Sequence, residues 1–230
     1  YIDMTLATIK RFGGEVMYNE GDYTEFFIEG NQSYTAVDYT IESDWSAAAI
    51  IMVAAAIAGE VTVRNISTLS LQADTAICRA LERAGASIII ESDSITVAQR
   101  PLSAFSFDAT HCPDLFPALV ALAAAAEGMT TIYGIERLRG KESDRGEVLT
   151  EEYRKLGIDI ELDYDENVMR IVGGEPRWAE VDSHDDHRIA MSLAVTSLRM
   201  ERPLEIGNSE CVAKSYPSFF EDLEMLKAAK

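Results

Sequence analysis

Three stretches of almost unbroken apolar residues alternate along the chain with mixed polar segments, and each begins just after an aspartate, namely Asp44, Asp114 or Asp186. The longest run, residues 47–58, consists mainly of alanine and aliphatic residues, and its 12 positions are too few to cross a bilayer. At Asp114 and Asp186 this position is typical of a helix N-cap. The pattern therefore predicts three buried helices. Each should be followed by a strand, at Val61–Asn65, Thr130–Tyr133 and Pro203–Gly207.

A second pattern recurs between these apolar runs: an amphipathic helix, a glycine and a short hairpin. The glycines are Gly13, Gly85 and Gly157, and both intervals between them are 72 residues long. Each glycine follows the last expected helical residue, as in a C-cap with positive φ. A short strand, an acidic turn and a second strand are expected next. The second strands are Tyr23–Ile28, Ser94–Ala98 and Asn167–Val172.

The two patterns share a period of about 70 residues and together predict an α/β fold of repeated units. One unit contains a helix, a strand, a connecting segment, a second helix and two strands. Because each unit has one strongly apolar helix, those helices can pack together inside sheets formed by the strands. Residues 1–42 supply only a helix and a hairpin, so we predict a domain boundary near Glu42–Ser43. Residues 1–42 are then the remnant of a preceding domain, and 43–230 form a second one.

The charge of the chain is strongly acidic. It has 20 Lys and Arg residues against 39 Asp and Glu residues, a formal net charge of -19. Nucleic-acid binding needs positive charge against phosphates, so a nucleic-acid partner is excluded, and an anionic membrane surface is disfavoured for the same reason. Five of the acids fall within residues 159–166, on an expected turn between strands. Net charge is an average, however, so a local site for anionic substrates stays possible.

The cysteines and the chain start give information about the cellular setting. The three cysteines are widely spaced and form no CxxC pair, which argues against a disulfide scaffold and fits a reducing cytoplasm. No signal peptide opens the chain. The chain begins at Tyr1 as if inside an amphipathic helix, without an initiator methionine, and we interpret it as a fragment of a longer protein.

The segment 134–145 departs most from the average charge and is the first candidate site. Arg137, Arg139 and Lys141 alternate, which on an extended segment places them on one face. Arg145 follows at the start of the next helix, whose N-terminus adds partial positive charge. Such a cluster suits carboxylate or phosphate binding. The alternative is a solvated loop whose cations pair with the acids of the same segment.

The second candidate is the segment 183–191, where two histidines and two aspartates fall within four residues. A metal site is one interpretation. His184 and His187 are three residues apart and straddle the start of a helix, which weakens that interpretation. Asp186 fits an N-cap, and an anion site at the helix start that uses Arg188 is better supported than a metal.

Two further segments carry candidate chemistry. Asp114 also stands at a helix start, so an N-cap is the default interpretation and a general base the functional one. Cys112 is interpreted as a small core residue, and Lys214, taken alone, as a surface lysine before the final helix. The repeat, however, could bring the helix starts at Asp114, Arg145 and Arg188 together at one cleft. Cations and carboxylates there suit acid–base chemistry on a phosphorylated or carboxylated small molecule.

At these motifs the sequence resembles the 5-enolpyruvylshikimate-3-phosphate (EPSP) synthase family, the 3-phosphoshikimate 1-carboxyvinyltransferases. The resemblance covers the chain from end to end, in the family's order. The matching motifs are residues 1–5, 111–114, 138–145, 185–191 and 213–217. Because family members are roughly twice as long, the resemblance also implies that an N-terminal half is absent from this chain.

The resemblance implies a fold and an activity. The expected fold is an inside-out α/β barrel lobe of repeated βαβαββ units, with helices inward and sheets outward. The expected reaction transfers the enolpyruvyl group of phosphoenolpyruvate to the 5-hydroxyl of shikimate 3-phosphate and releases phosphate, with no cofactor and no metal. The expected partners are these two substrates and the N-terminal lobe of the same protein, which is expected to be a monomer in the cytoplasm, without nucleic-acid or membrane partners.

The resemblance also assigns roles to individual residues. Asp114 would accept the proton of the attacking hydroxyl, and Glu142 with Lys214 would manage protonation of the phosphoenolpyruvate methylene carbon. The shikimate 3-phosphate contacts would be Asp114, Lys141, Arg137 and Tyr1, the phosphoenolpyruvate contacts Arg145, Arg188 and Lys214, and the supporting residues Asp186 and His187.

The sequence departs from the family pattern in two respects. Arg137 stands where the family often has an amide, and the family's N-terminal site residues are not in this chain, so the chain alone is predicted to be inactive.

One alternative function is that of an enolpyruvyl transferase that acts on UDP-N-acetylglucosamine. A second is a metal-dependent phosphohydrolase that uses His184 and His187. A third is a non-catalytic domain of a larger assembly.

Overall fold

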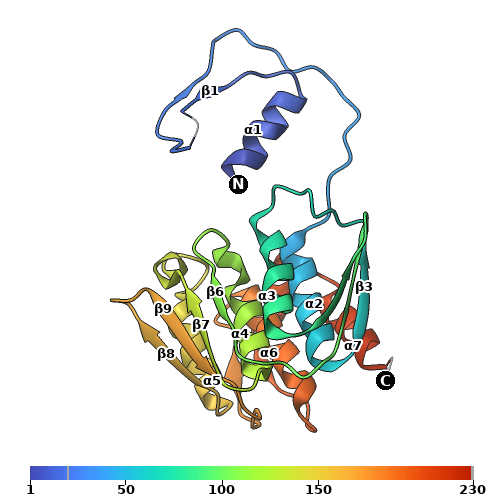
Figure 1. Ribbon diagram of the computed structural model, residues 1–230, viewed down its shortest axis with the longest axis vertical. Coiled ribbons are helices and arrows are strands. Elements are labelled where there is room, and N and C mark those ends of the chain that lie inside the picture. The colour runs from blue at the N-terminus through green and yellow to red at the C-terminus, as the bar shows by residue number, and fades with distance from the viewer. Residues whose placement is uncertain (20, 229–230) are drawn as a thin grey trace.

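The computed structural model describes residues 1–19 and 21–228, and its N-terminal segment stands apart from the rest (Figure 1). This segment contains α1 (Ile2–Arg11) and the hairpin of β1 (Met17–Tyr18) and β2 (Phe26–Phe27). Every residue of α1 is exposed or half-buried. An extended stretch then leads into the larger part of the molecule. The domain boundary near Glu42–Ser43 stays a prediction.

Three apolar helices form the interior of the larger part, as the hydrophobic pattern predicts. They are α2 (Trp45–Ala58), α4 (Phe116–Ala125) and α6 (His187–Thr196), and they pack against one another (Figure 1). Twelve of the fourteen residues of α2 and nine of the ten of α4 are buried. A helix that is apolar on all sides is stable only inside a protein. Each fully buried Val, Leu, Ile or Met side chain of these helices contributes about 1.5–3 kcal/mol.

Two sheets cover these helices. One has the antiparallel order β3–β5–β4; the other has the order β6–β7–β9–β8, in which β6 runs parallel to β7. The strands are β3 (Glu60–Arg64), β4 (Ser87–Ile90), β5 (Ser94–Ala98), β6 (Ser106–Asp108), β7 (Met129–Tyr133), β8 (Asp159–Asp163) and β9 (Val168–Val172). Burial alternates along β7, where Thr130 and Ile132 are buried while Met129 and Tyr133 are exposed. Such alternation is typical of a sheet with one face on the core.

The repeat that the sequence predicts is confirmed by the turns and by the order of elements. Gly13, Gly85 and Gly157 have φ values of 81°, 88° and 82°, the left-handed conformation that glycine adopts most readily. One complete unit runs β6, α4, β7, α5 (Arg145–Lys155), β8, β9. The chain therefore has a mixed α/β fold with apolar helices inside and sheets outside (Figure 1).

Some elements differ from the predicted bounds. The predicted strand Tyr23–Ile28 is only Phe26–Phe27, and Pro203–Gly207 is only β11 (Ile206–Gly207), which pairs in parallel with β10. The remaining elements are η1 (Ala73–Ala76), α3 (Ile77–Ala84), η2 (Pro113–Leu115), η3 (Ile135–Leu138), β10 (Val181–Asp182), η4 (Ser197–Arg199), η5 (Ser209–Lys214) and α7 (Phe219–Ala228). None of the helices in the described residues combines the length and apolar character needed to cross a bilayer.

A buried polar contact fixes the helices that carry the candidate site. The Tyr153 hydroxyl on α5 lies 2.6 Å from Ser192 Oγ and 2.8 Å from Thr196 Oγ1, both on α6. Ser192 Oγ in turn donates to the Pro117 carbonyl on α4, at 2.6 Å. Because buried polar groups must be paired, this contact specifies how the three helices meet. It joins α5 to α6 and, through Ser192, α6 to α4.

Candidate functional site

Arg145, the first residue of α5, lies at the centre of a cluster of charged side chains. Its Nη1 is 2.8 Å from Asp114 Oδ1, its Nε 2.8 Å from Asp186 Oδ2, and its Nη2 2.5 Å from Glu142 Oε2. The Arg145 side chain is only 1% exposed. Burial of an unpaired guanidinium would carry a large desolvation free energy. The three carboxylates offset that free energy. The cluster thus joins segments far apart in the sequence.

Asp114 is a second centre of the cluster, and its interpretation as an N-cap is wrong. It lies within η2, its side chain makes no capping hydrogen bond, and α4 begins after it at Phe116. Its carboxylate instead accepts hydrogen bonds from Lys141 Nζ at 3.2 Å and from the Tyr1 hydroxyl at 3.1 Å. Arg188 Nη2 is 3.8 Å away.

These cations determine the ionisation of Asp114. Burial raises the pKa of its carboxyl, but the charges of Arg188, Lys141 and Arg145 outweigh that effect and lower the pKa to about 2. The carboxylate is therefore ionised throughout the neutral range. An anionic ligand that neutralises these cations would raise the pKa of Asp114 again and make it a stronger base.

Asp186 has two functions in the cluster. It is the N-cap of α6, as the sequence predicts, with its Oδ1 accepting from the Arg188 amide at 3.0 Å. Its Oδ2 accepts from Arg145 Nε and from Ser143 Oγ, the latter at 3.1 Å. Burial opposes ionisation, yet the hydrogen bond and charge of Arg145 lower the pKa of this carboxyl. Asp186 therefore links the start of α6 to the start of α5.

The two histidines of the same segment lie in different surroundings. His187 is buried, and its Nδ1 has no hydrogen-bond partner among the described residues. Burial and the nearby charge of Arg188 lower the pKa of His187. His184 is exposed and faces Glu152, with which it belongs to a group of possible ligand atoms that does not include His187. In the described part of the chain the two histidines therefore do not share a metal site.

The prediction that Arg137, Arg139 and Lys141 share one extended face is wrong. Gly134 has a φ of 103° and packs so closely on Thr110 that a Cβ would lie 2.7 Å from its backbone nitrogen. The chain then turns into η3 instead of extending. Arg139 stacks on the Tyr164 ring, 4.3 Å from its centroid, and Arg137 is exposed. Of the three cations, Lys141 is the one that reaches Asp114.

Lys214 is closer to the cluster than its surroundings in the sequence indicate. It ends η5, and its Nζ donates to the Asp185 carbonyl at 2.9 Å. Asp185 immediately precedes the α6 N-cap. The lysine is exposed, so its ammonium group is available to a ligand.

Sequence reasoning missed two residues beside the cluster. Asp74 in η1 is 4% exposed and accepts a 2.5 Å hydrogen bond from Ser46 Oγ at the start of α2. Burial raises the pKa of this carboxyl, while the Ser46 hydrogen bond and the charge of Arg188 oppose that shift. Ser46 also lines a small hollow together with Asp114 and Arg188. The available signal for Ser46 was its position at the start of the predicted apolar helix, and the sequence held no signal for Asp74.

A larger hollow, of about 660 Å³, lies elsewhere, between α1, β1 and Leu71. The charged residues in its lining are Asp3, Lys10 and Glu15. It lacks the concentration of arginine, lysine and carboxylate that surrounds Asp114. The chemistry-bearing residues therefore gather at the helix starts and not in this hollow.

Comparison with known proteins shows clear similarity over the whole chain. A family model described as EPSP synthase (3-phosphoshikimate 1-carboxyvinyltransferase) matches residues 1–223. A Clostridioides difficile (strain 630) protein named 3-phosphoshikimate 1-carboxyvinyltransferase is 42% identical over 230 residues, 98% of this chain and 51% of that protein. A Clostridium perfringens (strain SM101 / Type A) protein of the same name is 40% identical, covering 98% and 53%. The chain spans about half the length of these curated relatives.

Solved structures show the same correspondence. An EPSP synthase from Acinetobacter baumannii matches with a TM-score of 0.81 and 30% identity, over 95% of this chain and 53% of that one. The enolpyruvyl transferase NikO from Streptomyces tendae matches with a TM-score of 0.72 over 98% of this chain and 52% of its own. At 23% identity, the second likeness concerns the fold alone.

Proposed function

Because the chain belongs to the EPSP synthase family, we propose that it is the C-terminal part of an enzyme that transfers the enolpyruvyl group of phosphoenolpyruvate to the 5-hydroxyl of shikimate 3-phosphate. The observation that carries the proposal is the cluster in which Lys141, Arg145 and Arg188 surround Asp114. It combines anion-binding groups with an ionised carboxylate at one place.

The cations account for the binding of two anionic substrates. Phosphate and carboxylate groups are bound most strongly by charge-assisted hydrogen bonds, and arginine can make two in parallel. In this proposal Arg145, Arg188 and Lys214 bind phosphoenolpyruvate. Lys141, Tyr1, Arg137 and Asp114 contact shikimate 3-phosphate. Asp186 and His187 support the start of α6.

The carboxylates account for the proton transfers. Asp114 takes the proton of the 5-hydroxyl as its oxygen bonds to C2 of phosphoenolpyruvate, while C3 gains a proton from Glu142 or Lys214. The C2–O bond to phosphate then breaks and phosphate leaves with that electron pair. C3 returns a proton to the group that donated one, and the C–H electron pair restores the double bond. General acid–base groups of this kind contribute about 10²–10⁴-fold each. Bound substrate anions would compete for the cations that hold the pKa of Asp114 at about 2, so its basicity rises when it is needed.

The proposal also requires a second lobe. We assign residues 1–42 to the remnant of an N-terminal lobe and residues 43–230 to the C-terminal lobe. The N-terminal lobe of the same protein would complete the site from the other side, in a monomeric enzyme of the cytoplasm. Buried free thiols at all three cysteines fit a reducing compartment. The chain without that lobe is expected to have no measurable turnover.

Release of inorganic phosphate tests this function. The two-lobed protein, in which an N-terminal lobe precedes this chain, should release phosphate when both substrates are present and not when either is left out. The same assay on this chain alone should give no release. The proposed function is wrong if the two-lobed protein is folded and inactive with both substrates, and the need for a second lobe is wrong if the chain alone turns over.

A further inference from the structure

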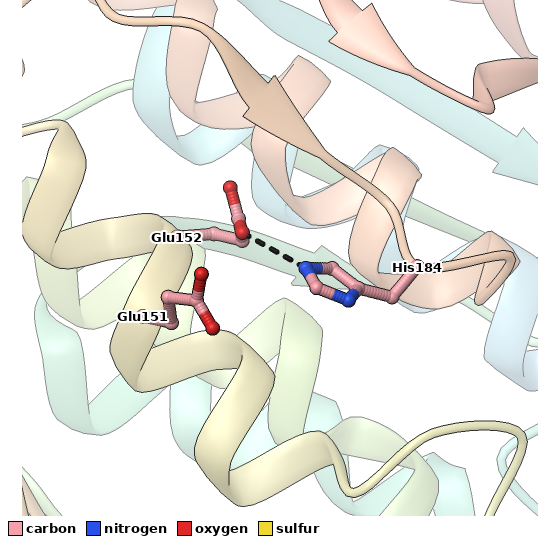
Figure 2. Close-up of side chains that lie close together, drawn as sticks. All are labelled: Glu151, Glu152 and His184. Carbon is pink, nitrogen blue, oxygen red and sulfur yellow. Dashed lines mark hydrogen bonds and ion pairs between the residues drawn. The ribbon is translucent and has the colours of Figure 1, made fainter.

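The carboxylate of Glu152, on α5, lies under the loop 182–186 and is contacted from three sides. Its Oε2 accepts the Asp182 backbone N–H at 2.9 Å. Its Oε1 accepts from Lys155 Nζ at 2.7 Å. The same oxygen lies 2.9 Å from His184 Nε2 (Figure 2). The side chain is 0% exposed, which is rare for a glutamate outside a paired environment. A buried carboxylate with this many partners holds those partners in place.

Lys155 provides the positive charge that this cluster requires. Burial opposes ionisation of Glu152, but the hydrogen bonds from Lys155, Asp182 and His184 outweigh it and lower the pKa of the carboxyl. The ligand atoms of Glu151, Glu152 and His184 also lie within 4.8 Å of one another, as a metal site would require. The Lys155 ammonium, however, pairs with the carboxylates of Glu151 and Glu152, at 3.5 Å and 2.7 Å, so it already neutralises the groups that a metal ion would bind. These contacts favour another role for Glu152, which we call a clamp: its carboxylate holds the loop 182–186 against α5.

The loop 182–186 has a conformation that needs such a clamp. His184 and Asp185 have φ values of 52° and 58°, two successive non-glycine residues in the left-handed region. That region is disfavoured for side chains with a Cβ, and it persists only where surrounding contacts impose it. Asp182 Oδ1 accepts a hydrogen bond from the His184 amide at 2.6 Å, and the Asp182 amide in turn donates to Glu152 Oε2. The contacts of Glu152 thus stabilise an unfavourable turn.

The turn has direct consequences for the cations of the proposed site. It places the Asp185 carbonyl where Lys214 donates to it, at 2.9 Å. It also brings Asp186 to the start of α6, where one carboxylate holds the side chain of Arg145 and the amide of Arg188. By contrast, Lys141 is fixed through Asp114, from another segment.

We propose that Glu152 is a positioning residue for the phosphoenolpyruvate subsite: by clamping Asp182 and His184 it sets the turn that orients Arg145, Arg188 and Lys214. This inference rests on the proposed function for the identity of the ligand. It leads to a selective effect, because the clamp acts on the cations assigned to phosphoenolpyruvate and not on Lys141. Loss of the clamp should therefore weaken the binding of one substrate only.

The test compares Glu152→Gln with Glu151→Gln in the two-lobed protein. Both substitutions remove one negative charge from α5, but the Glu151 carboxylate is exposed and, among the described residues, forms an ion pair only with Lys155, at 3.5 Å. For Glu152→Gln we expect the KM for phosphoenolpyruvate to rise about tenfold, with the KM for shikimate 3-phosphate unchanged and kcat nearly so. Glu151→Gln should stay within about twofold of the wild type in every parameter.

A merely structural role would lower the fraction of active enzyme and hence kcat, without a change in KM that is confined to one substrate. An unchanged KM for phosphoenolpyruvate, or equal rises in both KM values, overturns the proposal. If Glu152→Gln does not fold, His184→Ala removes one partner of the clamp and should give a smaller rise confined to phosphoenolpyruvate. Activity that is lost on chelation and restored by a divalent metal would assign the cluster to a metal and also overturn the clamp.

Hydrogen exchange on this chain separates the clamp from the proposed function. Glu152→Gln should speed the exchange of the amides of residues 183–188 relative to Glu151→Gln, while the amides of α4 stay protected. An inactive wild-type two-lobed protein would refute the function, and the exchange result would still decide the clamp. Equal exchange at residues 183–188 in both variants would refute the clamp even in an active enzyme.

Discussion

Two arginines of this chain each face three carboxylates, but in very different surroundings. The carboxylates around Arg145 are those of Asp114, Glu142 and Asp186, and those around Arg170 are those of Glu161, Asp163 and Glu166. The Arg145 side chain is 1% exposed, whereas that of Arg170, on β9, is 23% exposed. The same residue types therefore make one buried and one surface cluster.

The difference lies in where the partners come from. Arg170 pairs with residues of its own hairpin, less than ten positions away, so that cluster forms whenever the hairpin forms and is screened by water. Arg145 pairs with Asp114 and Asp186, which tertiary structure brings to it from other helix starts. Its cluster also contains Lys141. A site for anions requires this second arrangement, in which tertiary structure brings cations from several segments together.

Replacement of Arg145 should have the largest effect of the changes considered. Arg145→Met leaves the buried carboxylate of Asp186 and the half-buried carboxylate of Asp114 without their main partner. The free energy of unfolding should fall by about 3–5 kcal/mol, because an uncompensated buried charge is strongly destabilising. Urea denaturation of the chain followed by circular dichroism measures this loss. If Arg145→Met and Arg170→Met have the same urea midpoint of unfolding, the buried cluster stabilises the fold no more than the surface cluster, which contradicts this expectation.

Asp114→Asn should have the next largest effect, and on turnover more than on folding. Asparagine has nearly the same shape and can still accept a hydrogen bond from Lys141, but it cannot take up a proton. Turnover of the two-lobed protein should fall by about 10²–10⁴-fold. The steady-state rate of phosphate release, measured with both substrates saturating, gives the value. A near-normal rate would remove Asp114 from the proposed mechanism.

The acid stability of the chain should depend on Asp114 as well. Its pKa is lowered from 3.8 to about 2, so its ionised form stabilises the folded state. Such a contribution is complete above pH 3.8 and is lost as the pH falls toward about 2. The gap in unfolding free energy between the wild type and Asp114→Asn should therefore narrow over this window. A gap that stays constant with pH would contradict the role of the cations in holding the carboxylate ionised.

The smallest effect is expected at the surface cluster. Arg170→Met removes ion pairs that are exposed on the β8–β9 hairpin. Phosphate release by the two-lobed protein should stay within about twofold of the wild type, since surface ion pairs contribute little. The thermal unfolding midpoint of the chain should likewise stay close to that of the wild type. A large loss of activity would mean that this hairpin takes part in the site.

Local and periodic features were predictable from the sequence. The turn glycines were predictable from their position after amphipathic helices, and Gly13, Gly85 and Gly157 all adopt the predicted left-handed conformation. The buried helices follow from apolar runs, and the capping role of Asp186 follows from its place before one of them. Each of these signals depends on neighbours within a few residues.

Features that depend on tertiary contacts were not predictable in the same way. Asp114 stands before an apolar run just as Asp186 does, yet it pairs with cations from distant segments and does not cap its helix. Arg139 and Lys141 alternate in sequence, but the η3 turn sends the first onto Tyr164 and the second to Asp114. Glu152 has the sequence context of an ordinary helix-surface glutamate, and only the packing of the loop 182–186 buries it. The catalytic roles assigned by family resemblance stay predictions.

In the proposed function, the buried Arg145 cluster, and not the Arg170 cluster, binds the anionic substrates. The most direct test is phosphate release by the two-lobed protein with either Arg145→Lys or Arg170→Lys, because both variants keep the positive charge. Lysine cannot reproduce the three-sided contacts of Arg145, so that variant should lose at least about 10²-fold in kcat/KM for phosphoenolpyruvate, while Arg170→Lys should match the wild type. Equal kcat/KM values in the two variants would contradict the claim.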